Sequence, residues 1–131
     1  MKIIVASHGK YAHGIVNAAK RLAVVDSALY EICAYEDCRT INELFDEVLD
    51  ENNEEITIIL TDLFGGSVNQ FVMNNLLNEN TYVIAGINVY CLLRVLTINE
   101  NEDIEKQIME IISDSKDQMV NVNQLIIEKG Y

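Results

Sequence analysis

Four short apolar runs, separated by stretches with helical periodicity, limit the folds open to this chain of 131 residues. Each run is nearly continuous in hydrophobic or β-branched residues, a pattern typical of strands that are covered on both faces. Strands that alternate with helices predict an α/β fold: a single domain spanning residues 1–131, with a doubly wound, mainly parallel sheet flanked by helices. We expect strands at Lys2–Ala6, Leu29–Tyr35, Ile56–Leu60 and Thr81–Ala85.

Two of the intervening stretches carry the capping-box spacing, a Ser or Thr followed three residues later by Glu or Gln. Thr40 with Glu43 and Ser67 with Gln70 have this spacing, so we expect Thr40 and Ser67 to be helix N-caps. Apolar residues at helical spacing predict further helices within residues 15–23, 88–96 and 104–112. The last apolar segment, Gln124–Glu128, is expected to form a short terminal strand.

Composition and charge exclude several classes of protein. The net charge of −12 argues against a nucleic-acid binder or a protein that binds anionic membranes. No apolar run approaches the ~20 residues needed to span a bilayer, and Met1–Ala6 leads directly into a strand, so we expect no secretory signal. Cys33, Cys38 and Cys91 match neither a disulfide framework nor a zinc pattern. We therefore expect a reduced, cytoplasmic protein with no metal and no cofactor.

The acidic residues gather in two segments, 43–55 and 100–117, whereas the first 25 residues contain none. Two solvated helix faces would account for this pattern. Alternatively, one end of the molecule is less negative than the rest and could hold an anion. Charge alone does not decide between these interpretations.

A histidine and an aspartate follow two strands that would be neighbours in a flavodoxin-like sheet. His8 follows the first strand, and Asp62 follows the third. In such sheets, ligands bind beyond the carboxyl ends of the strands, at the point where the winding direction reverses. A neutral imidazole is a good nucleophile, and a carboxylate bonded to one ring nitrogen leaves the lone pair of the other nitrogen available.

The segment after Asp62 could bind phosphate. Gly65 and Gly66 offer backbone N–H groups without side chains and lead into a helix N-terminus, which favours anions. Ser67 could donate its hydroxyl to a phosphoryl oxygen. Each residue also has an ordinary role, as a loop histidine, a turn aspartate, a tight glycine turn or a helix cap. Their convergence favours a site with His8 and Asp62 as catalytic residues and Gly65, Gly66 and Ser67 as phosphate-binding residues. Lys10 and His13 are expected to be solvated side chains without chemistry.

Three segments resemble the mannose-family (mannose/fructose/sorbose) enzyme IIA domains of the bacterial phosphoenolpyruvate-dependent sugar phosphotransferase system. They are IIVASHGKYAHGI, ILTDLFGGSVNQ and AGINVYCLLRVL, and the resemblance covers essentially the whole chain. It implies a cytoplasmic phosphotransferase in which His8 accepts a phosphoryl group from HPr and passes it to an enzyme IIB domain for sugar uptake. The supporting aspartate of the family matches Asp62, and its Gly-Gly-Ser loop matches Gly65, Gly66 and Ser67.

The chain departs from this family at two positions. The family often has proline after Gly-Gly-Ser, where this chain has Val68, and in the loop after the fourth strand, where it reads Asn88-Val89-Tyr90. Losing the first proline removes some preorganisation but no phosphate ligand. Losing the second could alter partner recognition.

The resemblance also implies a homodimer in which the C-terminal segment, Val122–Glu128, pairs as a strand with the sheet of the other subunit. On the residues alone, this segment could equally pair with the edge of its own sheet. Two other functions stay open: a phosphoryl donor for a dihydroxyacetone-kinase-type system, and a non-transferring regulatory module of the same fold. A receiver domain is disfavoured, because it would need acidic residues where this chain has Ser7-His8.

Overall fold

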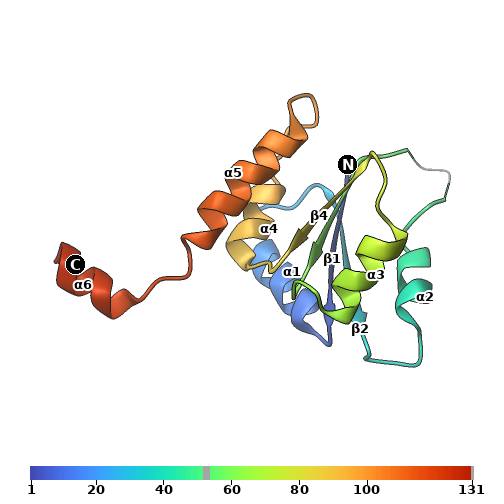
Figure 1. Ribbon diagram of the computed structural model, residues 1–131, viewed down its shortest axis with the longest axis horizontal. Helices are drawn as coiled ribbons and strands as arrows, with labels where there is room; N and C mark the ends of the chain where they lie inside the picture. The colour runs from blue at the N-terminus through green and yellow to red at the C-terminus, as the bar shows by residue number, and fades with distance from the viewer. Residues whose placement is uncertain (52–53, 131) are drawn as a thin grey trace.

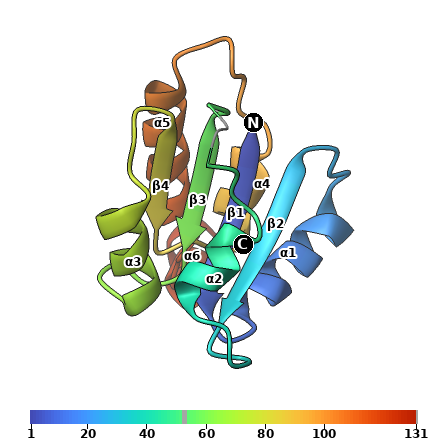
Figure 2. The ribbon, with the colours of Figure 1, turned by 90° about the vertical axis from the view of Figure 1, so that its right-hand side faces the viewer.

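A four-stranded sheet, with every strand parallel to its neighbours, forms the centre of the computed structural model, which describes residues 1–51 and 54–130. The strand order is β2-β1-β3-β4, so β1 and β3 are the central strands, and β2 and β4 are the two edge strands (Figure 2). This arrangement confirms the expected α/β fold and makes the first and third strands neighbours. The strands are β1 (Lys2–His8), β2 (Ala28–Ala34), β3 (Thr57–Thr61) and β4 (Thr81–Ala85).

Helices cover both faces of the sheet (Figure 1). On one face, α1 and α4 pack on the strands and α5 packs against α4; on the other face lie α2 and α3. Residues 3–6 of β1 and 58–60 of β3 are completely buried, which explains why these strands have no polar face. The helices are α1 (Tyr11–Leu22), α2 (Ile41–Asp46), α3 (Ser67–Asn75), α4 (Val89–Val95), α5 (Ile104–Lys116) and α6 (Val122–Lys129).

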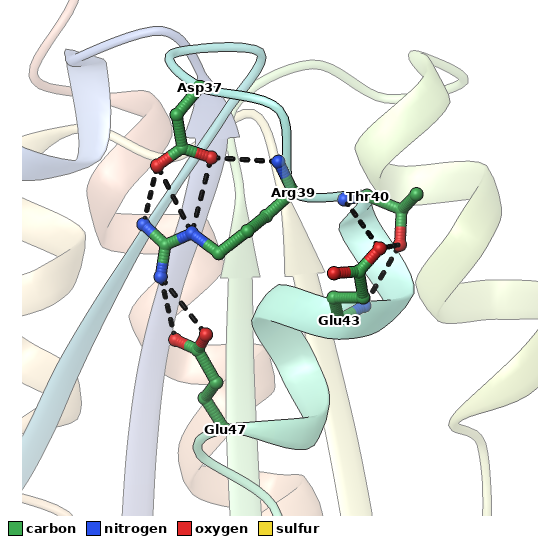
Figure 3. A network of polar contacts seen from close by, with 5 residues as sticks. All are labelled: Asp37, Arg39, Thr40, Glu43 and Glu47. Carbon is green, nitrogen blue, oxygen red and sulfur yellow. Dashed lines mark hydrogen bonds and ion pairs between the residues drawn. The ribbon is translucent and has the colours of Figure 1, made fainter.

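The connection from β2 to α2 is held by a network of polar side chains, which Figure 3 shows. The capping box is present as predicted: the Thr40 hydroxyl accepts from the Glu43 backbone N–H, and the Glu43 carboxylate accepts from the Thr40 N–H. Beside it, the Arg39 guanidinium donates to Asp37 at 2.6 Å and to Glu47 at 2.8 Å. The network therefore ties the segment that follows β2 to both ends of α2, whose N-cap is Thr40 and whose C-cap is Glu47.

The predicted N-cap role of Ser67 is wrong. Helix α3 begins at Ser67 itself, and the preceding Gly66 is the N-cap, with no side-chain capping bond. The Gln70 side chain does reach back, but it donates to the Gly65 carbonyl at 2.6 Å. Tertiary partners explain the difference, because the Ser67 hydroxyl lies within hydrogen-bond distance of the side chains of His8, at the end of β1, and Tyr35, just after β2.

The predicted C-terminal strand is also wrong, because this segment forms helix α6. The Asn121 side chain caps the helix by accepting from the Gln124 N–H, and Gly130 ends it in the left-handed conformation, with φ of 68°. A run of only three consecutive apolar residues, Leu125 to Ile127, is too short for its periodicity to distinguish a helix from a strand. The segment is not placed as an exchanged strand.

Helix α6 stands apart from the sheet and from the other helices (Figure 1). All of its residues are described, and none of them is buried. Ile127 is 74% exposed, and Val122 is 56% exposed. Within the described residues, this helix therefore has an apolar surface that the rest of the chain does not cover. Among the described residues, no helix has the length and hydropathy needed to cross a bilayer.

Candidate functional site

His8 and Asp62 meet at the carboxyl edge of the sheet, between the two central strands. His8 is the last residue of β1, and Asp62 directly follows Thr61, the last residue of β3. One Asp62 carboxylate oxygen, Oδ2, lies 2.9 Å from His8 Nδ1 and accepts from the His8 backbone N–H, also at 2.9 Å. The aspartate therefore fixes both the backbone and the ring of the histidine.

The Asp62 carboxyl is partly buried, with its side chain 14% exposed. Burial by itself would raise the pKa of this carboxyl, but the hydrogen bonds from the His8 backbone and ring outweigh it, so the pKa lies below the ordinary value. The other oxygen, Oδ1, accepts from the Leu63 N–H at 3.0 Å. An ionised carboxylate can only accept hydrogen bonds, so the proton of the neutral His8 ring is on Nδ1.

With the proton on Nδ1, the lone pair of the ring is on Nε2. The Ser67 hydroxyl oxygen lies 3.0 Å from His8 Nε2, and the Tyr35 hydroxyl lies 2.6 Å from the same serine oxygen. Since Nε2 accepts, Ser67 donates to it, and Tyr35 in turn donates to Ser67. Three side chains thus form one directed chain of hydrogen bonds that ends on the ring nitrogen with the free lone pair.

The two glycines of the loop have different structural tasks. Gly65 has φ of 80°, the left-handed region that favours glycine, and its N–H donates to the Asn69 side chain at 3.1 Å. Gly66 has no side chain where one would crowd the His8 ring. A Cβ at this position would lie 3.2 Å from both His8 Cε1 and the Leu63 carbonyl oxygen. The Gly66 N–H donates to Leu63 O at 3.0 Å. Both N–H groups expected to hold phosphate thus already have protein partners.

The backbone donors of this loop that lack partners inside helix α3 are those of its first turn, including Ser67 and Val68. These N–H groups, together with the helix dipole, make the start of α3 attractive to an anion. The Ser67 side chain is at the same place. The donors that an anion could reach at this loop are therefore the Ser67 hydroxyl and the first-turn N–H groups of α3, and not the N–H groups of the two glycines.

Sequence reasoning missed two residues that shape the site. Asn69 is 1% exposed; its amide donates to the Thr61 hydroxyl at 3.0 Å while its oxygen accepts from Gly65, so it braces the glycine loop. An asparagine two residues after Gly-Gly-Ser, on the buried face of the helix, was the available signal. Tyr35 carried no such signal, because only the strand order brings it beside His8 and Ser67.

The site is open to solvent. The His8 side chain is 41% exposed, and the adjoining Leu63 and Phe64 are 62% and 76% exposed. His13 lies elsewhere, on α1, where its Nδ1 is 2.7 Å from Glu31. Lys10 is exposed at the start of α1. Among the residues that the structure describes, no group of three or more His, Cys, Asp or Glu side chains could hold a metal ion.

Solved structures with this fold include several phosphotransferase proteins. A protein from Klebsiella pneumoniae, described as a candidate phosphoenolpyruvate-dependent sugar phosphotransferase system permease, is 25% identical, with a TM-score of 0.85 over 95% of this chain and 93% of its own. Component EIIA from Streptococcus agalactiae is 21% identical, with a TM-score of 0.73 over 94% and 98% of the two chains. The mannose/sorbose-specific IIA subunit from Enterococcus faecalis is 19% identical, with a TM-score of 0.71 over 92% of each chain.

No curated protein matches the sequence. Residues 2–112, however, match the family described as the PTS system fructose IIA component, EIIA-man. This match covers β1 to most of α5 and includes His8, Asp62 and the glycine loop. The chain therefore belongs to the EIIA-man family of the phosphotransferase system.

Proposed function

We propose that this component of the phosphotransferase system is a cytoplasmic phosphocarrier, in which His8 accepts a phosphoryl group from HPr and passes it to an enzyme IIB domain. The observation that carries the proposal is the pairing of His8 Nδ1 with the Asp62 carboxylate at 2.9 Å. This pairing leaves the lone pair on Nε2, the ring nitrogen next to Ser67 and the start of α3.

In the proposed transfer, the lone pair of His8 Nε2 attacks the phosphorus of the phosphohistidine on HPr. The donor P–N bond breaks, and its electron pair returns to the donor nitrogen. The His8 proton stays on Nδ1, where the Asp62 carboxylate stabilises the positive charge that develops on the ring. Transfer to enzyme IIB repeats these steps, with His8 as the donor.

The groups around Nε2 suit a phosphoryl group. The Ser67 hydroxyl can rotate to donate to a phosphoryl oxygen, and the first-turn N–H groups of α3 attract its negative charge. Gly66 keeps the approach to the ring free of a side chain. Because His8 is 41% exposed and flanked by exposed Leu63 and Phe64, the site is accessible to a histidine carried on another protein.

We also propose that the protein is a homodimer in which α6 packs against the second subunit as a helix. The support is its exposed apolar side chains, Val122, Ile126 and Ile127, which the described part of the same chain leaves uncovered. A shallow hollow of about 260 Å³ near the end of β4 is partly apolar, with Ile84, Cys91 and Ile112 in its lining. It could receive apolar side chains of such a helix.

The proposed function is tested by incubating the protein with labelled phosphoenolpyruvate, enzyme I and HPr. We expect one label, acid-labile and base-stable as a phosphohistidine is, which then moves to enzyme IIB. Absence of any label would contradict the proposal, as would an acyl phosphate, which base hydrolyses. A label that passes to a dihydroxyacetone-kinase-type subunit, and not to IIB, would favour the alternative donor role. A label that passes to neither would favour a regulatory module.

A further inference from the structure

Tyr35 has a backbone conformation that local sequence does not favour. It follows β2 with φ of 68°, in the left-handed region, and it is the one described residue other than glycine with positive φ. In this conformation the tyrosine Cβ is sterically crowded by the backbone, and glycine, which has no Cβ, would avoid this cost. Strain of this kind persists only where surrounding contacts hold it, and it gathers at functional sites.

The Tyr35 side chain contacts two residues of the His8 site. Its neighbour Ala34 pairs with His8 across the sheet and accepts from the Gly9 N–H at 2.8 Å. The left-handed turn then places the Tyr35 ring 5.5 Å from the His8 ring, centroid to centroid, and the hydroxyl 2.6 Å from Ser67 Oγ. The tyrosine is nevertheless 61% exposed, so core packing does not explain its position.

The Tyr35 hydroxyl lies next to the position that the oxygens of a phosphoryl group on His8 would take. A phosphoryl group on His8 Nε2 would occupy the lone-pair direction in which the Ser67 hydroxyl now lies, at 3.0 Å. Ser67 would have to rotate aside, and phosphoryl oxygens would take its place beside the Tyr35 hydroxyl. That hydroxyl is already turned to donate toward this point, so it could keep its direction and change only its acceptor.

From these contacts we infer that Tyr35 is a phosphoryl-binding residue, whose hydroxyl donates directly to a phosphoryl oxygen on His8 while its ring covers one side of the group. The inference rests on the proposed role of His8. It adds a side chain from the turn after β2 to the Ser67 hydroxyl and the first-turn N–H groups of α3 as partners of the phosphoryl group. Charge-assisted hydrogen bonds of this type favour the charged form of the acceptor. Tyr35 therefore favours the phosphoryl dianion over the monoanion.

The test uses the full chain and phosphoramidate, a small donor that does not require HPr. In its zwitterion, the P–N bond breaks as His8 Nε2 attacks phosphorus, and the nitrogen leaves with the electron pair as ammonia. The phosphoryl group of the phosphorylated protein is then titrated by ³¹P NMR. In Tyr35→Phe, which keeps the ring, the phosphoryl pKa should rise. At the pH of the wild-type midpoint, the ratio of dianion to monoanion in Tyr35→Phe should be about threefold to tenfold lower than in the wild type.

Tyr30→Phe is the matched control, because Tyr30 is an exposed tyrosine on β2, the strand that precedes Tyr35, and removing its hydroxyl leaves the His8 site intact. Its titration should equal that of the wild type. A second comparison repeats Tyr35→Phe in a Ser67→Ala background. Direct contact predicts that the shift persists there, whereas an action only through Ser67 predicts that it disappears.

These outcomes separate the two proposals. Equal titrations of the wild type and Tyr35→Phe, or a shift that vanishes in Ser67→Ala, would overturn the inference and leave the phosphocarrier role standing. Failure of HPr to label a protein that phosphoramidate does label, with the Tyr35→Phe shift present, would overturn the carrier role and support the inference. A folded protein that phosphoramidate cannot label on His8 would overturn both.

Discussion

The carboxyl edge of the sheet and helix α6 both expose their side chains to solvent, but tertiary contacts hold only the first. At the sheet edge, His8 is bonded to Asp62 and Ser67, and Ser67 to Tyr35, at distances of 2.6–3.0 Å. Helix α6 has caps at both ends but no buried residue. A fixed, exposed polar group suits chemistry on a partner protein, whereas an apolar helix without cover suits assembly.

The largest expected effect is the loss of phosphorylation in His8→Ala, which tests whether the carboxyl edge of the sheet performs the chemistry. His8 is the residue that offers a lone pair beside the start of α3. Labelling from HPr should be abolished in His8→Ala and largely retained in His13→Ala, since His13 pairs with Glu31 away from the site. Loss of labelling in His13→Ala alone would contradict the assignment.

Asp62→Asn should slow transfer without preventing it. The amide can still hydrogen-bond to His8, but it lacks the negative charge and can bind the wrong tautomer of the ring. An orienting or acid–base group of this kind contributes about 10²–10⁴ in rate. Rapid-quench measurement of transfer from phosphorylated HPr tests this, and a rate within about threefold of the wild type would exclude the role.

Removal of α6 tests whether this helix holds two subunits together. Truncation after Gln118 should convert a homodimer, about twice the 14.8 kDa of one chain, into a monomer, because the helix contributes no buried residue to its own subunit. Ile127→Lys should weaken the dimer, whereas Leu22→Lys, at an exposed leucine on α1, should not. Light scattering at ~10 µM would show this, and a full-length monomer there would exclude an obligate dimer.

The two loop glycines should separate activity from stability. Gly66→Ala keeps an allowed backbone but brings a methyl group within 3.2 Å of His8 Cε1, so the ring must shift and transfer should slow about three- to tenfold. Gly65→Ala meets no atom within 4 Å but forces alanine into φ of 80°. It should lower the free energy of unfolding by about 1–2 kcal/mol. Equal effects of the two variants on both measurements would contradict this division.

The smallest expected effect is on stability in acid. The pKa of Asp62 is lower in the folded protein, so its ionisation stabilises the fold above the unfolded-state pKa. This contribution is lost as the pH falls through the folded-state pKa. Urea unfolding at neutral and acidic pH should therefore show a weaker pH dependence in Asp62→Asn than in Asp26→Asn, a control at an exposed loop position. An unchanged pH dependence in Asp62→Asn would contradict the expected linkage.

Much of the fold and of the site could be predicted from local pattern. Strands β1 and β3 were found because residues buried on both faces leave a continuous apolar run, and Thr40 was found because its capping partner is three residues away. His8 and Asp62 were placed together because parallel strands end at a common edge. Their chemistry as a phosphocarrier stays a prediction.

The sequence by itself determined two kinds of feature. Some have interaction partners close along the chain, and others follow from the alternation of strands and helices. Only the tertiary structure decided between Ser67 as a helix cap and Ser67 as a partner of His8 and Tyr35, which lie 59 and 32 residues away. It likewise brought Tyr35 to the site and made residues 122–129 a helix. The physical reason is competition: a hydroxyl or a short apolar run has several favourable local states, and the contacts available in the folded chain select among them.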